Sequence, residues 1–171
     1  GGVWGVGGGV GNEEVVMAKG GDGWGEVVDH PGGVGIVALD DQGRVALGRQ
    51  FRDAVGQHLW EIPAGKREKG ENPFVTAQRE LNEEVGAAAA RWTELGSIIA
   101  SPGCYAEVLS LYMAEGLTYS RQPLEADAFL EVRFFPFAEA VEKCMSGEIR
   151  DGKTVTAVLK ARLLQEKTCT L

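Results

Sequence analysis

The segment between residues 72 and 86 limits the fold of this chain most narrowly, because it carries signals for both ends of one helix. Asn72 is a favourable N-cap, and Pro73 follows at the first helical position, where a missing N–H costs nothing. Gly86 suits the left-handed position that ends a helix. The apolar side chains between these ends form one stripe at helical spacing: Phe74, Leu81 and Val85. The sequence therefore predicts an amphipathic helix packed on a core.

Three carboxylates lie on another face of this predicted helix. At about 100° per residue, Glu80, Glu83 and Glu84 span roughly 100° of arc, on the side away from the apolar stripe. Carboxylates this close repel one another unless water or a cation screens their charges. A solvated acidic face is the ordinary explanation for such a group, and a cation site is the alternative.

The residues around the three glutamates follow a fixed spacing that favours the cation site. They read Gly65-x5-Glu71-x7-Arg79-Glu80-Leu81-x-Glu83-Glu84-x-Gly86-Ala87. This pattern resembles the signature of the Nudix hydrolases, a glycine and a glutamate followed by REUxEExGU, where U is apolar. Its last position is usually a bulky aliphatic residue and is Ala87 here. Seven identities at fixed spacing are expected by chance less than about once in a million chains.

The resemblance implies a hydrolase that depends on Mg²⁺, with Mn²⁺ as a substitute. Carried over position by position, Glu80 and Glu84 are the expected metal ligands, together with Glu83 and the carbonyl of Ala64. Glu83 and Glu84 are expected to serve catalysis as well. Hard oxygen ligands suit such ions, which neutralise a diphosphate, activate a water and stabilise the leaving oxygen. Arg79 is expected to pair with Glu71 and so to orient the helix and the loop before it.

Residues outside the motif resemble the ADP-ribose pyrophosphatase branch of the family. Pro102 lies 16 positions after Gly86, as in that branch, and three segments also match: 49–52, 59–65 and 147–154. The branch hydrolyses ADP-ribose or a related nucleoside diphosphate sugar to a nucleoside monophosphate and a sugar phosphate. By position, Arg52 would bind the diphosphate and Glu61 would line the site near the metals. Glu107 would accept hydrogen bonds from a sugar hydroxyl. The alternatives are a surface charge for Arg52 and a solvated loop acid for Glu107.

One stretch departs from the branch. Its members carry a run of acids that supplies the base for the attacking water, but here Ala126 and Ala128 stand where glutamates are expected. Glu125 and Asp127 are the nearest catalytic replacements. The alternative function is therefore a catalytically weakened nucleotide-sugar-binding or regulatory module of the same fold.

The rest of the chain predicts strands first, with helices interspersed. The expected strands are 34–39, 44–51, 59–62, 92–100, 108–114 and 129–135, and two more helices are expected at 137–145 and 154–165. Without regular strand–helix–strand alternation, an α+β fold or an α/β/α sandwich is favoured over a doubly wound sheet. The resemblance implies the Nudix fold, an α/β/α sandwich with a mixed β-sheet and the loop–helix–loop motif, in one domain over residues 27–171.

Glycine is concentrated at one end of the chain, with 14 of its 25 glycines in the first 35 residues. No window there fits a phosphate-binding loop pattern, so residues 1–26 are expected to be irregular. In the resembled branch this segment instead forms strands exchanged within a homodimer. Glycine is a poor strand former, which weakens that expectation.

Charge and cysteine content exclude several classes of protein. A net charge of −8 argues against nucleic acid or an anionic membrane as a partner. The three cysteines are far apart and form no CxxC pair, which argues against structural zinc or a disulfide framework and fits a cytoplasmic setting. No apolar stretch approaches the roughly 20 residues of a membrane span. His30 and His58 stand in no partner motif, and a structural role is expected for each.

Overall fold

The computed structural model describes residues 4–5, 15–20, 23–120 and 131–168. The predicted catalytic residues Glu125 and Asp127 lie outside these ranges, as does the start of the strand expected at residue 129. Within the described ranges, no helix is long and apolar enough to cross a membrane.

The main sheet is mixed, as predicted. Its strands are β1 (Trp4–Gly5), β2 (Val15–Gly20), β3 (Gly23–Val28), β4 (Gly33–Ala38), β7 (Ala64–Lys66), β8 (Ala87–Ser101) and β9 (Tyr105–Tyr119). They are ordered β1–β2–β3–β9–β4–β7, and β8 also pairs with β9. Strand β9 runs parallel to β4 and β3 but antiparallel to β8. It is therefore the strand that joins the other parts of this sheet.

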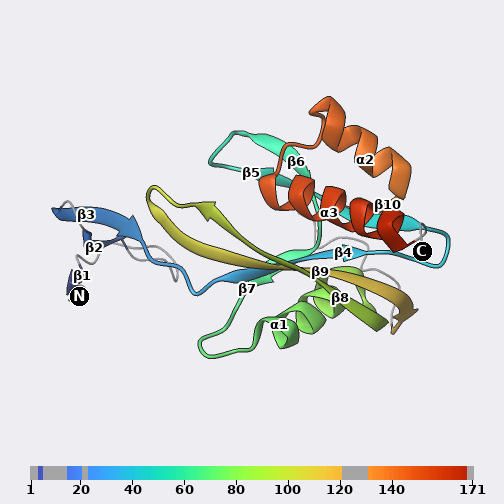
Figure 1. Ribbon diagram of the computed structural model, residues 1–171, viewed down its shortest axis with the longest axis horizontal. Helices are drawn as coiled ribbons and strands as arrows, with labels where there is room; N and C mark the ends of the chain where they lie inside the picture. The colour runs from blue at the N-terminus through green and yellow to red at the C-terminus, as the bar shows by residue number, and fades with distance from the viewer. Residues whose placement is uncertain (1–3, 6–14, 21–22, 121–130, 169–171) are drawn as a thin grey trace.

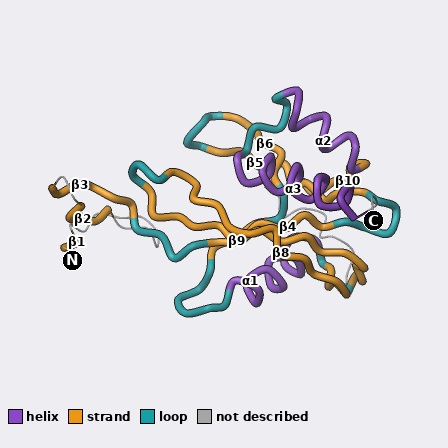
Figure 2. The backbone as a smooth tube through the Cα atoms, in the orientation of Figure 1, coloured by secondary structure: helices purple, strands orange, loops and turns teal. Residues whose placement is uncertain are grey.

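A second, antiparallel sheet has the order β10 (Glu131–Pro136), β5 (Arg44–Arg52) and β6 (Gln57–Glu61). The helices are α1 (Pro73–Glu80), which continues into a π-helical turn η1 (Leu81–Val85), then α2 (Phe137–Ser146) and α3 (Gly152–Thr168). Figures 1 and 2 show α1 on one side of the main sheet and α2 and α3 on the other. The predicted α/β/α layering is confirmed.

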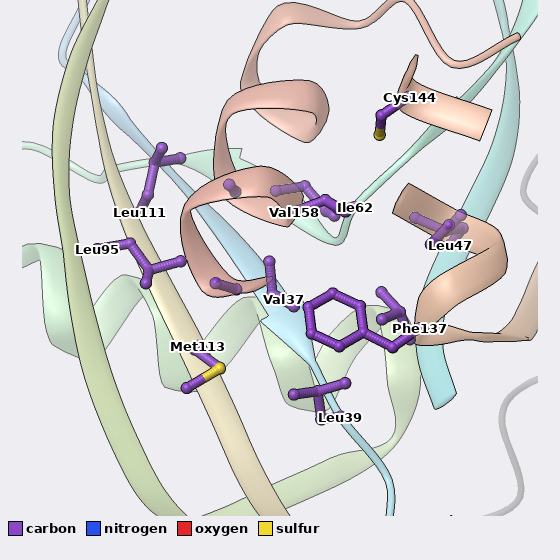
Figure 3. Packing of buried hydrophobic residues seen from close by; sticks show 14 of the residues in the cluster. Val37, Leu39, Leu47, Ile62, Leu95, Leu111, Met113, Phe137, Cys144 and Val158 are labelled. Carbon is purple, nitrogen blue, oxygen red and sulfur yellow. The ribbon is translucent and has the colours of Figure 1, made fainter. Parts of the chain in front are cut away.

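Two buried clusters hold the layers together because alternate strand residues face opposite sides of the main sheet. Val34, Ile36 and Ala38 of β4 pack against α1 and η1, where Leu81 and Val85 are fully buried. Residues on the other face pack against Phe137 of α2 and Val158 of α3, as Figure 3 shows: Val37, Leu39, Leu111 and Met113.

The helix predicted over residues 72–86 has the expected ends but a different final turn. The Asn72 side chain accepts the N–H of Phe74 at 2.9 Å, and Gly86 adopts a left-handed φ of 71°. Between them, the last turn widens from α to π, so the assumption of 100° per residue was wrong for Glu83 and Glu84. Phe74 is 37% exposed, not buried in the stripe, because it lies at the edge of the sheet against Trp92 and Tyr112.

Part of the glycine-rich segment forms strands. Strands β2 and β3 pair antiparallel along their length, and β1 pairs with β2. This group of strands projects away from the helices in Figure 1. At the end of β3, the Val28 N–H donates to the carbonyl of Cys104 at 2.8 Å. Cys104 lies in the loop that leads into β9.

Candidate active site

A cleft of about 850 Å³ opens where the start of β9, the ends of β5 and β6, the start of β7 and the N-terminus of α3 meet. The structure brings five predicted site residues to its wall: Arg52, Glu61, Ala64, Glu84 and Glu107. Glu80 and Glu83 stand on the same helix as Glu84 but are not on this wall. The wall also contains residues to which the sequence assigned no role in chemistry: His30, Lys66, Tyr105, Asp151 and Lys153.

Gly65 is required by the carboxylate of Glu80. A Cβ at residue 65 would lie 2.0 Å from the Glu80 Cδ, so this carboxylate occupies the space that the missing side chain leaves. Glu80 is 8% exposed. A solvated acidic face therefore does not describe Glu80, which turns inward against the loop between β7 and α1.

Arg79 holds this helix to the loop that precedes it. Its Nε and Nη2 donate to the Glu71 carboxylate at 3.2 and 3.0 Å, which is the predicted pairing. Its Nη1 donates to Glu80 at 2.7 Å and to Glu83 at 3.3 Å. The hydrogen bonds from Arg79 lower the pKa of Glu71 to about 2. One guanidinium thus donates hydrogen bonds to three carboxylates. Of these three, the Glu83 side chain is 55% exposed.

Glu84 is the helix carboxylate that reaches the cleft. Its Oε2 accepts the Ala64 N–H at 3.2 Å. Burial, and then the nearby charge of Glu80, raise the pKa of Glu84 to about 8. Burial also raises the pKa of Glu80. Two carboxylates held close together in a half-buried place resist ionisation unless a positive charge compensates them.

These donors fit a hard divalent cation, which compensates such charges through oxygen ligands. Within the described ranges, however, no three acidic, histidine or cysteine side chains are gathered around one point as a metal cluster. Glu80 and Glu83 both accept hydrogen bonds from Arg79, and Glu84 accepts one from the N–H of Ala64. A cation bound here would have to draw Glu83 away from Arg79 if all three glutamates were to be its ligands.

Two cations elsewhere in the cleft share one buried carboxylate. Arg52 donates through Nε and Nη2 to both oxygens of Glu61, at 2.7 and 2.9 Å. Lys153 donates to the same Glu61 at 2.5 Å and to Asp151 at 3.0 Å. Although burial opposes ionisation, these two cations keep the pKa of Glu61 below its ordinary value. The result is a group of two cations, Arg52 and Lys153, held by Glu61 and Asp151 in the same cleft as Glu84.

The N-terminus of α3 positions Lys153. Asp151 caps this helix, because its Oδ2 accepts the N–H of Thr154 at 3.1 Å and the Thr154 hydroxyl at 2.5 Å. The Thr154 oxygen in turn accepts the N–H of Ile62 at 3.0 Å in the protein interior. One threonine therefore ties α3 to the chain between β6 and β7. Segment 147–154 was noticed in the sequence, but nothing in its local pattern revealed that Lys153 meets Glu61.

Comparison with known proteins identifies the family of this chain. The NUDIX domain matches residues 29–158, which include every cleft residue named above. The chain belongs to the NUDIX family. The motif from Gly65 to Ala87 is thus its Nudix motif, and Glu80, Glu83 and Glu84 are the glutamates of that motif.

Three relatives of this Nudix chain are named as pyrophosphatases, and a solved structure shares its fold. An ADP-ribose pyrophosphatase of Bacillus subtilis is 37% identical over 85% of the chain and 80% of its own length. An ADP-ribose pyrophosphatase of Mycobacterium tuberculosis is 40% identical over 86% and 72%. A GDP-mannose pyrophosphatase of Salmonella typhimurium is 34% identical over 76% and 73%. A solved structure described as an ADP compounds hydrolase matches the fold with a TM-score of 0.78 at 20% identity, covering 98% of this chain and 93% of that one.

Proposed function

We propose that this Nudix hydrolase cleaves the diphosphate of ADP-ribose, or of a related nucleoside diphosphate sugar, to give a nucleoside monophosphate and a sugar phosphate. The observation that carries the proposal is one cleft that brings the motif carboxylate of Glu84 together with two cations, Arg52 and Lys153. A diphosphate ester needs both, because its own charge attracts guanidinium and ammonium groups and also the metal ions that carboxylates hold. Relatives named for ADP-ribose and GDP-mannose support the substrate class.

The charged groups of the cleft have different parts in the proposed reaction. The Arg52 guanidinium, whose side chain is 43% exposed, offers donors that suit two phosphate oxygens while Glu61 keeps it extended into the cleft. Lys153 adds a second positive charge from the N-terminus of α3. Glu107 accepts hydrogen bonds from a sugar hydroxyl. Glu84, at the edge of the cleft, faces the phosphates together with Glu80 behind it.

The proposed cofactor is Mg²⁺, with Mn²⁺ as a substitute. Its ligands would be Glu80, Glu84, Glu83 and the Ala64 carbonyl. When bound, the ion neutralises diphosphate charge and activates water. Glu83 and Glu84 also serve the proton transfers of the reaction, together with Glu125 and Asp127 if the segment that carries them reaches the cleft.

The experiment that tests this function is direct. Purified protein with ADP-ribose and Mg²⁺ is expected to release AMP and ribose 5-phosphate, and EDTA is expected to stop the reaction. Glu84→Gln should reduce the rate about a hundredfold or more, because it removes a ligand and proton acceptor. Glu142→Gln, an exposed glutamate of α2, is the matched control and should retain the rate. Binding of ADP-ribose without turnover would instead support the weakened binding module, and GDP-mannose tests the sugar and the base.

The proposed assembly is a homodimer. A small antiparallel group of strands such as β1–β3 has little core of its own and gains stability by packing on another surface. Beside it lies an apolar hollow of about 340 Å³, lined by Val27, Ile99, Pro102 and Val108 among others. Ile99 is 62% exposed in the single chain. A second copy of this chain would cover both features at once.

A further inference from the structure

His30 lies on the wall of the cleft, but its side chain belongs to the interior, with 1% of its surface exposed. It stands in the connection from β3 to β4, where the chain reads His30-Pro31-Gly32. The sequence favoured a structural role for this residue. Its surroundings indicate a more specific one.

The backbone that carries His30 is firmly held. Gly32 has a φ of +87°, which side chains rarely tolerate, and a Cβ there would lie 3.1 Å from the Val108 carbonyl oxygen. The Gly32 carbonyl accepts the N–H of Arg67 at 2.9 Å. Strand β9 and the end of β7 therefore fix this turn from two sides.

One ring nitrogen of His30 anchors the imidazole to this turn. The Gly32 N–H donates to the His30 Nδ1 at 3.0 Å. A nitrogen that accepts a hydrogen bond carries no proton, so the neutral ring carries its proton on Nε2. Nε2 lies 3.6 Å from the Glu107 Oε1, slightly beyond hydrogen-bonding distance. The ring thus presents an N–H to the carboxylate of Glu107.

Strand β9 supplies the other two contacts. Tyr105 and Glu107 are alternate residues and so project from the same face of the strand. The ring of Tyr105 packs against the imidazole with centroids 5.2 Å apart and planes at 60°. Tyr105 and Gly32 together leave the imidazole one orientation, in which Nε2 is near Glu107.

We propose that His30 is a positioning residue that orients Glu107, so that the carboxylate accepts hydrogen bonds from a ribose hydroxyl of the substrate. This inference rests on the proposed function. The Glu107 side chain is 20% exposed at the cleft wall, and a neutral N–H donor selects one of its orientations without adding positive charge to the sugar end of the cleft. The second carboxylate oxygen remains for the hydroxyl. Such a contact exists in the bound substrate as well as in the transition state, so its loss raises KM more than it lowers kcat.

A pair of substitutions separates the two ring nitrogens. His30→Asn has an oxygen near the position of Nδ1, which keeps the acceptor for Gly32 but removes the donor to Glu107. His30→Gln is longer and brings an amide nitrogen near the position of Nε2. We expect His30→Asn to raise the KM for ADP-ribose about five- to tenfold, the effect of losing the hydrogen bond between Glu107 and the sugar hydroxyl, with kcat within about twofold. His30→Gln should recover most of the KM, and melting temperatures of both variants should stay near that of the parent.

A double-substitution cycle supplies a readout that a merely structural role would not move. In a Glu107→Ala background, His30→Asn should cause no further increase in KM, because the side chain it orients is gone. Additive effects would overturn the inference. So would a parental KM in His30→Asn, or equal losses in the Asn and Gln variants.

Failure of this inference is distinguishable from failure of the proposed function. If the parent protein does not hydrolyse ADP-ribose, the proposed reaction fails, and the same variants are then compared by calorimetric binding of ADP-ribose. A weaker Kd in His30→Asn that His30→Gln restores would support the positioning role without catalysis. An unchanged Kd, or no binding by the parent, would overturn it.

Discussion

Gly65 and Glu80 touch across the first part of the Nudix motif, and their contact depends on a missing Cβ. The Glu80 carboxylate lies where an alanine side chain at residue 65 would begin, and Arg79 holds that carboxylate from the other side. The glycine is therefore needed for the space it leaves and not for a left-handed backbone, since its φ is not among the positive values. Residue 65 sets how deeply Glu80 is buried.

Gly65→Ala is expected to displace Glu80 from the loop. Overlap of this size costs about 1–3 kcal/mol in the free energy of unfolding, because the neighbouring groups have to shift. A shift of about 1 Å in a proposed metal ligand should lower the rate of ADP-ribose hydrolysis about a hundredfold. Urea unfolding and AMP release measure the two effects.

The matched control is Gly25→Ala in β3, where an added Cβ meets nothing within 4 Å. It should retain the parental stability and rate. A Gly65→Ala protein with parental activity would show that the burial of Glu80 is not needed for catalysis.

At the scale of elements, the N-terminus of α3 is joined to the chain after β6 by one hydroxyl group. Thr154 is fully buried; it donates to the Asp151 cap and accepts the N–H of Ile62. The same helix start carries Lys153 to Glu61. A loss of this junction therefore affects both stability and the position of Lys153 in the cleft.

Thr154→Val replaces the hydroxyl with a methyl group of similar size. It leaves the buried Ile62 N–H without its acceptor and weakens the helix cap, so the free energy of unfolding should fall by about 2 kcal/mol. Thermal or urea unfolding measures this change, and the KM for ADP-ribose should rise as Lys153 loses its position. Thr93→Val, at a partly buried site in β8, is the control and is expected to change stability little. Equal effects at both positions would contradict a special role for Thr154.

The elements of this fold differ in how well the sequence predicted them. The helix at residue 72 was predictable because its cap and its closing glycine are local signals. The π-helical turn was not, because a single extra residue in a turn leaves the apolar spacing of Leu81 and Val85 compatible with an α-helix. Strands β8 and β9 are each 15 residues long, well beyond the predicted 92–100 and 108–114. The first four residues of β8 are alanines, which are poor strand formers and gave no strand signal.

The residues of the candidate site also differ in how well the sequence predicted them. The glutamates of the helix and Arg52 were identified from motif positions. Lys153 was not, because its partner Glu61 is 92 residues away in the sequence and no local pattern encodes that contact. His30 was expected to be only structural for a related reason, since its neighbour Glu107 is distant in the sequence and comes near it only because β9 runs parallel to β4.

At the scale of the whole molecule, the layered body and the strands β1–β3 differ in how they are stabilised. The body has buried clusters on both faces of its sheet. The projecting strands pair mainly with each other, and β3 meets β9 in register at only Val28 and Tyr105. This contrast is the physical basis for expecting a second copy to cover them.

Light scattering of the full chain is expected to give twice the mass of one subunit. Ile99→Asp places a charge in the apolar hollow beside β3 and should shift the protein towards monomer at micromolar concentration, because an unpaired buried charge is costly. Leu163→Asp, at an equally exposed leucine of α3, should remain dimeric. A monomeric parent at every concentration would refute the dimer.

The wide spacing of the cleft residues has a consequence for folding of the protein. The wall begins with His30, and its second cation comes with Lys153, which meets Glu61 only after α3 has docked. Every described strand that pairs with β4 or β9 precedes α3 in the sequence. The hydrogen bonds of the main sheet therefore do not require α3, whereas the substrate cleft is complete only when this helix has docked.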